Sequence, residues 1–204
     1  MPNIELLEKS MPVAPIRIAA LGCRELAEEV DRKLVKFRNE LVKRKQLSVI
    51  PQGYSEESFI VECECPRFGT GEGKGYIKES VRGTDLYIMV DVTNYSESYT
   101  VCGHENHMSP DNHFQDLKRI ISAATGKAHR INVIMPFLYE GRQHRRTKRE
   151  SLDCALALKE LSDMGVSNII TFDAHDPRVQ NSIPLNGFDN FFPTYQFLKA
   201  LIKS

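Results

Sequence analysis

Hydrophobic positions along the chain follow two spacings, which predict strands and helices in alternation. Short apolar runs typical of buried strands occupy residues 16–22, 59–65, 85–92, 131–135 and 168–172, with a shorter candidate at 47–51. Apolar residues recur three or four positions apart over 25–45, 112–125, the stretch after Ser151, and 194–203. Strands that alternate with helices indicate an α/β fold.

The stretch from residue 131 to residue 175 organises the chain. It contains an apolar strand, a basic loop, an amphipathic helix and a second apolar strand that ends on Asp173-Ala-His175-Asp176. Two buried strands joined by a helix predict a parallel βαβ unit. Ligands of open parallel sheets bind outside the carboxyl ends of the strands. The basic loop and the acidic turn should therefore share one crevice, an anionic-substrate site with cations for phosphate and carboxylates for a metal ion.

Composition narrows the class of protein. The 204 residues are enough for a substantial core, and Lys plus Arg equals Asp plus Glu at 27 each. The zero net charge argues against nucleic acid as a partner. No apolar run approaches 18 residues, and the first residues lack the order of a signal peptide. Five cysteines without framework spacing fit a reducing compartment. We expect a cytoplasmic protein.

Each half of the predicted site also has a plainer interpretation. The basic run over 142–149 could be a solvated start of a helix, although cations there oppose the helix dipole and an anionic ligand explains them better. Planar arginine forks suit phosphate, and carboxylates with water suit Mg²⁺. Asp173, His175 and Asp176 could instead form a turn or helix cap with a hydrogen-bonded histidine. Both alternatives stay open.

Two other groups of residues could carry metal chemistry. The polar stretch over 93–112 and its flank hold Cys102, His104, His107 and His113, whose spacing matches no closed zinc motif. A solvated loop is the expectation there, with a metal site as the alternative. Cys63 and Cys65 fall on one face of a strand, where packing is expected. The glycines over 69–75 predict a mobile hairpin; no helix follows them, which excludes a dinucleotide-binding fingerprint.

Four blocks of sequence resemble the amino-terminal half of the ribose-phosphate pyrophosphokinase family. Phe68-Gly-Thr70-Gly-Glu72 resembles the family's Phe-x-(Asp/Asn)-Gly-Glu hairpin, which contacts the adenine of ATP, often across a subunit interface. The segment 136–143, ending in Arg142-Gln143, resembles its Pro-Tyr-x-x-Tyr-Ala-Arg-Gln block, which binds ATP. The segment 169–175 resembles Ile-Thr-Met-Asp-Leu-His, and the segment 186–193 resembles Val-Asp-Asn-Leu-x-Ala-x-Pro.

The resemblance implies a fold and a set of site residues. The fold would be a Rossmann-like, three-layer, mostly parallel sheet flanked by helices, a phosphoribosyltransferase-like domain over residues 16–204 after an irregular arm over 1–15. His175 would be catalytic and lie beside the Mg²⁺-bound phosphates, with Asp173 as a second metal candidate. Arg178 is a weaker phosphate candidate. The implied nucleotide-binding residues are Phe68, Thr70, Glu72, Arg142, Gln143, His144, Arg145 and Arg146.

The resemblance also implies an activity, although the chain differs from the family pattern at several positions. The complete enzyme would transfer the diphosphoryl group of ATP to ribose 5-phosphate with Mg²⁺, as a homo-oligomer. Thr70, His144 and Thr147 replace residues usual in the family, and the stretch over 93–112 is longer. The family's second half, with its phosphoribosyl-binding loop, has no counterpart here, so we expect the carboxyl-terminal domain to be absent and this chain alone to be inactive. A non-catalytic, regulatory subunit is the alternative.

Overall fold

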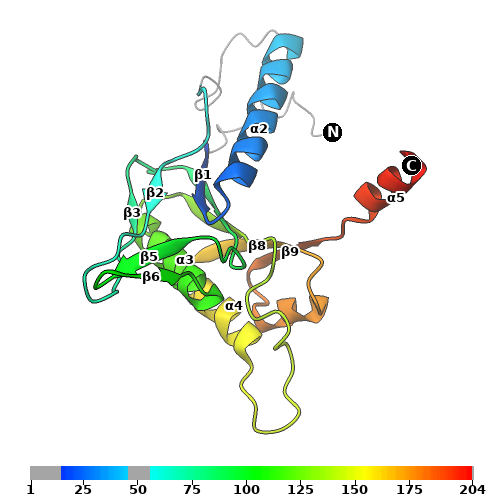
Figure 1. Cartoon of the computed structure of the whole chain (residues 1–204). Coiled ribbons are helices and arrows are strands. Elements are labelled where there is room, and N and C mark those ends of the chain that lie inside the picture. Colours follow the sequence, from blue (N-terminus) through cyan, green and yellow to red (C-terminus); the bar gives the residue numbers. More distant parts are fainter. Residues whose placement is uncertain (1–14, 46–55, 204) are drawn as a thin grey trace.

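A parallel sheet of five strands forms the centre of the protein in the computed structural model, which describes residues 15–45 and 56–203 (Figure 1). Its strands lie in the order β1-β4-β7-β8-β9, and every neighbouring pair is parallel. The bounds are Ile16–Leu21 (β1), Asp85–Val90 (β4), Arg130–Ile134 (β7), Val166–Phe172 (β8) and Gly187–Phe191 (β9). The predicted α/β class with a mostly parallel sheet is confirmed.

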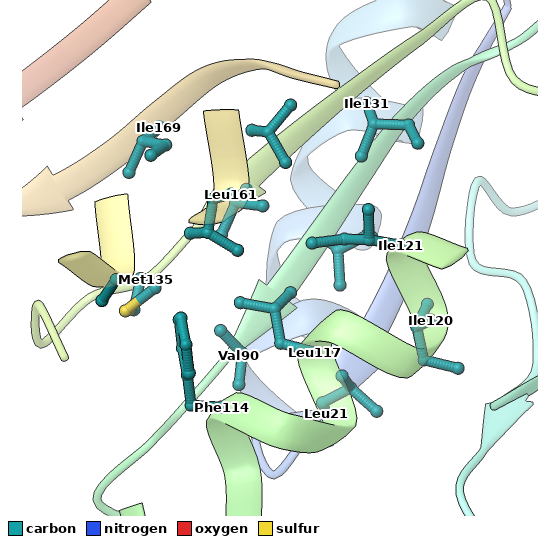
Figure 2. Close-up of a cluster of buried hydrophobic side chains, with 14 of the residues drawn as sticks. Leu21, Val90, Phe114, Leu117, Ile120, Ile121, Ile131, Met135, Leu161 and Ile169 are labelled. Atoms are coloured by element: carbon teal, nitrogen blue, oxygen red, sulfur yellow. The ribbon is translucent and has the colours of Figure 1, made fainter. Parts of the chain in front are cut away.

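Helices cover both faces of the sheet, because successive side chains of a strand point to opposite faces. On β4, Ile88 belongs to the core beneath α3 (Pro110–Ala124) and α4 (Asp153–Asp163), whereas Met89 packs on the side of α2 (Arg24–Lys45). Figure 2 shows the larger core, where side chains of α3 and α4 meet those of the strands. This arrangement gives the three layers that the sequence predicted.

The βαβ unit predicted over residues 131–175 is present as β7, α4 and β8. The helix predicted over 112–125 is α3, and the Ser109 side chain accepts a hydrogen bond from the backbone N–H of Asn112 at 3.2 Å. That contact satisfies one of the free donors at the helix start. The helix predicted over 194–203 is α5 (Thr194–Lys203), which projects away from the sheet (Figure 1).

Several predicted elements differ from the observed ones. Only β2 (Cys63–Glu64) is a strand within 59–65, and it forms a hairpin with β3 (Tyr76–Ile77). Residues 59–61 run beside β1 through two hydrogen bonds of 2.8 Å to Ile18, so their burial comes from an edge contact rather than from a full strand. The predicted strand over 47–51 and all but the last residue of the predicted arm over 1–15 lie outside the described residues.

The polar stretch expected to be a solvated loop contains a second hairpin, β5 (Ser98–Val101) and β6 (His104–His107). Its turn residues Cys102 and Gly103 both have positive φ, the combination that a two-residue hairpin turn needs. The strand β9 was also not predicted, although its segment resembled a family block. A short 3₁₀ helix, η1 (Pro177–Ser182), lies between β8 and β9. Within the described residues, no helix has the length and apolar character needed to cross a membrane.

Candidate functional site

The loops that follow β7 and β8 leave the sheet side by side. Pairing with β8 continues beyond the end of β7, because the N–H of Met135 donates to the carbonyl of Ile170 at 2.8 Å and that of Phe172, the last residue of β8, donates to the carbonyl of Pro136 at 3.4 Å. The basic loop after β7 and the acidic turn after β8 therefore start from one edge. This is the carboxyl edge where ligands of parallel sheets bind.

Arginines of the basic loop present free guanidinium groups to solvent. The Arg142 guanidinium lies 5.8 Å from the centre of the Phe137 ring, a cation–π contact that restricts its direction. Arg145 and Arg146 are exposed, and their side chains have no ion-pair or hydrogen-bond partner among the described residues. Three cations without carboxylate partners form a surface suited to an oxyanion.

Gln143 closes the base of this loop. Its side-chain amide donates to the backbone carbonyl of Ser151 at 2.7 Å, and its backbone carbonyl accepts from the N–H of Cys154 at 3.3 Å. These contacts join the start of the loop to the first turn of α4. The amide that the resemblance assigned to ATP is thus engaged within the loop.

The turn after β8 is supported by β9. Asp173 has a φ of 49°, a left-handed conformation that Asp adopts more readily than most residues. Its N–H donates to the carbonyl of Phe191 at 2.9 Å, and the N–H of Ala174 donates to the Asn190 side chain at 3.0 Å. The exposed side chains of Asp173 and His175 therefore emerge from a turn that two residues of β9 hold in place.

Asp176 has a structural role at the start of η1. Its carboxylate accepts from the Arg178 N–H at 2.9 Å and from the Arg178 guanidinium at 2.6–3.1 Å. The hydrogen bonds from Arg178 hold the pKa of Asp176 well below its usual range. Asp176 is therefore the cap aspartate of the plainer interpretation, while Asp173 is free of such contacts.

The two loops meet at His144. Its Nε2 lies 3.5 Å from Oδ2 of Asp176, and its ring centre lies 5.1 Å from that of His175. The histidine after Arg142-Gln143 thus contacts the turn after β8 directly. The basic loop and the acidic turn therefore lie against each other, as their places after neighbouring strands predicted.

Asp173 and His175 could hold a metal ion together with a phosphate-bearing ligand. Neither the carboxylate of Asp173 nor a ring nitrogen of His175 has a hydrogen-bond or ion-pair partner among the described residues. Mg²⁺ commonly binds through one or two protein groups, several waters and substrate phosphates. No group of three or more His, Cys, Asp or Glu side chains in the described ranges forms a metal site by itself. The residues fit an ion that a polyphosphate brings with it.

The hairpin that carries Phe68, Thr70 and Glu72 lies elsewhere. The Thr70 hydroxyl donates to the Glu72 carboxylate at 2.8 Å, and the N–H of Phe68 donates to the carbonyl of Glu72 at 2.7 Å. This glycine-rich hairpin packs against α3 and the β5–β6 hairpin, at the left of Figure 1, whereas the loop after β7 extends toward the bottom. Within one copy of the chain, the structure does not bring it to the strand ends.

The cysteines and histidines near residues 93–113 do not converge. His113 is buried in α3 with Nε2 2.8 Å from the carbonyl of Asn94, whereas His104, His107 and Cys102 are exposed. Cys63 and Cys65 donate their S–H groups to the carbonyls of Ala20 and Asp116, and burial raises their thiol pKa values to about 11 and about 12. All five cysteines are free, so no disulfide scaffold is present.

Sequence reasoning missed two residues that shape the site. Asn190 supports the acidic turn, and Phe137 lies under Arg142. The first belongs to a segment with no clear strand signal. The second could have been found, because it is an aromatic residue that precedes Arg142 by only five residues.

A five-stranded parallel sheet with helices on both faces defines the class, a three-layer α/β domain. The chain belongs to the ribose-phosphate pyrophosphokinase family, because residues 18–165 match the family model of the N-terminal domain of ribose phosphate pyrophosphokinase. It is 30% identical over 129 residues to ribose-phosphate pyrophosphokinase of Corynebacterium ammoniagenes, and 29% over 140 residues to ribose-phosphate pyrophosphokinase B of Dictyostelium discoideum.

These matches cover 61% and 67% of the chain but only 36% and 38% of those relatives, so the matched part spans well under half their length. The crystal structure of phosphoribosylpyrophosphate synthetase from Mycobacterium smegmatis has the same fold, with a TM-score of 0.61, 17% identity, and coverage of 92% of this chain and 51% of that one.

Proposed function

We propose that this chain is the nucleotide-binding domain of a ribose-phosphate diphosphokinase, in which the diphosphoryl group of ATP is transferred to ribose 5-phosphate. One observation carries the proposal. The free arginines after β7 and the free imidazole of His175 after β8 lie at one edge of the sheet, and His144 joins the two loops. A polyphosphate laid along this edge would meet the guanidinium groups of the basic loop and the imidazole of His175.

The chemistry assigned to these residues is positioning and charge neutralisation. Diphosphoryl transfer requires alignment of donor and acceptor and stabilisation of developing charge more than covalent catalysis. Arg142, Arg145 and Arg146 would hold the phosphates, and His175 would contact the phosphates at the strand end. When bound, Mg²⁺ would neutralise phosphate charge, with Asp173 and His175 as its nearest protein groups.

The hairpin suggests that a complete nucleotide site uses two copies of the chain. Phe68 and Glu72 are exposed in the hairpin that packs against α3, and Phe68 is 53% exposed although it is large and aromatic. We assign these residues to the adenine of a nucleotide bound to a neighbouring copy. We assign the ribose 5-phosphate site chiefly to the part of the longer relatives that lies outside the matched region.

Calorimetry with Mg-ATP tests the proposal directly. The wild-type chain should bind Mg-ATP saturably, and Arg142→Ala should weaken binding about tenfold or more, because a charge-assisted contact to phosphate is lost. Arg82→Ala is the matched control: Arg82 is equally exposed but precedes β4, at the opposite edge of the sheet. Equal losses in both variants, or unchanged affinity in Arg142→Ala, would exclude the assigned site.

A regulatory subunit is the second candidate, and the internal engagement of Gln143 and His144 favours it. Those two side chains bind the protein rather than point to solvent. Absence of Mg-ATP binding by a properly assembled oligomer would support this candidate. Saturable binding that depends on Arg142 would exclude it.

A further inference from the structure

Both ring nitrogens of His144 contact other parts of the protein. Nδ1 lies 3.1 Å from the backbone carbonyl of Arg142, and Nε2 lies 3.5 Å from the carboxylate of Asp176. The side chains of His144 and Asp176 are 13% and 11% exposed, so the contact is largely shielded from water. One ring thus connects the start of the basic loop to the turn after β8.

The contact is anchored firmly on the β8 side. Asp176 is fixed by its hydrogen bonds to the backbone and guanidinium of Arg178, and it caps η1. A carboxylate already held in place gives His144 a defined partner. The imidazole in turn binds the carbonyl of Arg142, the residue whose guanidinium faces the proposed phosphate site.

The other contact at the base of the loop lies on the α4 side. Gln143 joins the loop to Ser151 and Cys154. Gln143 therefore closes the loop on itself, whereas His144 fixes the closed loop against the neighbouring strand. Arg145 and Arg146 follow His144 directly, so their approach to His175 depends on that contact.

We propose that His144 is a positioning residue that fixes the basic loop over the end of β8 through Asp176, rather than a residue that contacts the nucleotide. The proposal deepens the proposed function, on which its ligand-binding part rests. A direct nucleotide contact would act only when ligand is present. Loss of a positioning contact changes the conformation of the loop in the free protein as well.

Limited trypsin digestion of the free chain measures this difference. Trypsin can cut after Arg142, Arg145, Arg146, Lys148 and Arg149, all within the loop. His144→Ala should accelerate cleavage there about three- to tenfold, because proteolysis follows the population of the open loop and the contact with Asp176 is lost. His144→Gln, which keeps a donor toward Asp176, should recover most of the slow cleavage.

A double-mutant cycle assigns the effect to the contact itself. Asp176→Asn keeps an oxygen for the Arg178 cap but removes the charge that faces His144. In that background, His144→Ala should change loop cleavage by less than about twofold. Asp163→Ala is the control, because it removes an exposed ion pair of α4 with Lys159 and should leave loop cleavage unchanged. His144→Asp places a second carboxylate beside Asp176 and should open the loop more than His144→Ala does.

Circular dichroism melts accompany every variant, so that loop opening is separated from loss of the fold. Unchanged cleavage in a folded His144→Ala variant, or equal His144→Ala effects in both backgrounds, would overturn the proposal. Calorimetry then tests the ligand part: His144→Ala should weaken Mg-ATP binding about three- to tenfold, in step with loop opening. If His144→Ala opens the loop but the wild-type chain does not bind Mg-ATP, the positioning role of His144 stands and the proposed nucleotide-binding function is refuted instead.

Discussion

Arg67 and Asp116 form a buried ion pair that joins the glycine-rich hairpin to α3. Two guanidinium nitrogens of Arg67 each lie 2.8 Å from an oxygen of Asp116, and the two side chains are only 6% and 8% exposed. Arg119 of α3 also binds Asp116. The hairpin proposed to contact adenine is therefore held to the body of the protein by a fixed pair of charges.

Arg67→Ala should destabilise the chain by about 2–4 kcal/mol, because removal of one partner leaves Asp116 buried with only Arg119 to compensate it. Urea unfolding followed by circular dichroism measures the loss. Lys159→Ala is the control, since it removes an exposed ion pair and should cost under about 1 kcal/mol. Equal losses of stability in the two variants would mean that burial of the Arg67–Asp116 pair adds nothing to the free energy of unfolding.

The close approach of Gly75 to α3 gives a second prediction. A Cβ atom at Gly75 would lie 2.5 Å from the backbone carbonyl oxygen of Arg119, whereas one at Gly69 would meet nothing within 4 Å. Gly75→Ala should therefore cost about 1–3 kcal/mol of stability, because backbone atoms must shift. Gly69→Ala in the same hairpin should be nearly neutral, and chemical unfolding of both variants compares them.

Mixing of two defective variants tests whether the site spans two copies. Glu72→Ala impairs the hairpin and Arg142→Ala impairs the strand-end loop. If one copy donates its hairpin to another, a mixture of the two should recover part of the Mg-ATP binding that each lacks, since some pairs hold one intact site. Binding by the mixture no better than the average of the separate variants would contradict the shared site.

Two substitutions of Asp173 can separate its backbone conformation from its role in metal binding. Asp173→Asn keeps a residue that tolerates the left-handed conformation, so stability should change by less than about 0.5 kcal/mol. It removes the free carboxylate, so the Mg²⁺ dependence of ATP binding should weaken several-fold. Asp173→Val should instead destabilise the fold by about 1–2 kcal/mol. Calorimetry over a Mg²⁺ series and thermal melts distinguish the two effects.

Cysteine reactivity should be confined to one site. Cys102 is exposed, whereas burial raises the thiol pKa values of Cys23, Cys63 and Cys154 to about 11 and that of Cys65 to about 12. Because the thiolate is the reactive form, iodoacetamide at pH 8 should modify Cys102 first, as peptide mass spectrometry would show.

The same raised thiol pKa values predict a loss of stability in alkali. Between the ordinary thiol pKa of 9.0 and about 11, the folded chain keeps protons that the unfolded chain releases. Their contribution to stability is therefore complete below pH 9 and is lost as the pH rises through 11. Urea midpoints measured from pH 8 to pH 10.5 should fall, and a flat profile would contradict the predicted proton linkage.

The central βαβ unit was predictable because its strands are short apolar runs and its helix has one apolar stripe. Such patterns leave little choice of structure. The strand β9 was not predicted, since its alternating side chains are only half-buried and it contains no β-branched residue. The β5–β6 hairpin was missed for a related reason: β6 is His-Glu-Asn-His, fully exposed, and is held by backbone pairing that leaves no hydrophobic pattern.

The candidate site was predicted in its location and less completely in its contacts. Neighbouring parallel strands must bring their carboxyl ends together, so the meeting of the basic loop and the turn that carries His175 followed from topology. The contact of His144 with Asp176 did not, because it depends on the path of an irregular loop. Likewise, no pattern indicated that the Gln143 amide would close that loop.

The helix α5 keeps its large apolar side chains in water. Tyr195, Phe197 and Ile202 are 68%, 65% and 85% exposed, and the helix projects from the sheet (Figure 1). Anything that covers this surface in the folded state adds its binding free energy to the free energy of unfolding. The unfolding midpoint of this chain therefore depends on the composition of the solution as well as on the sequence. It rises with any molecule that binds the exposed face of α5 in the folded state.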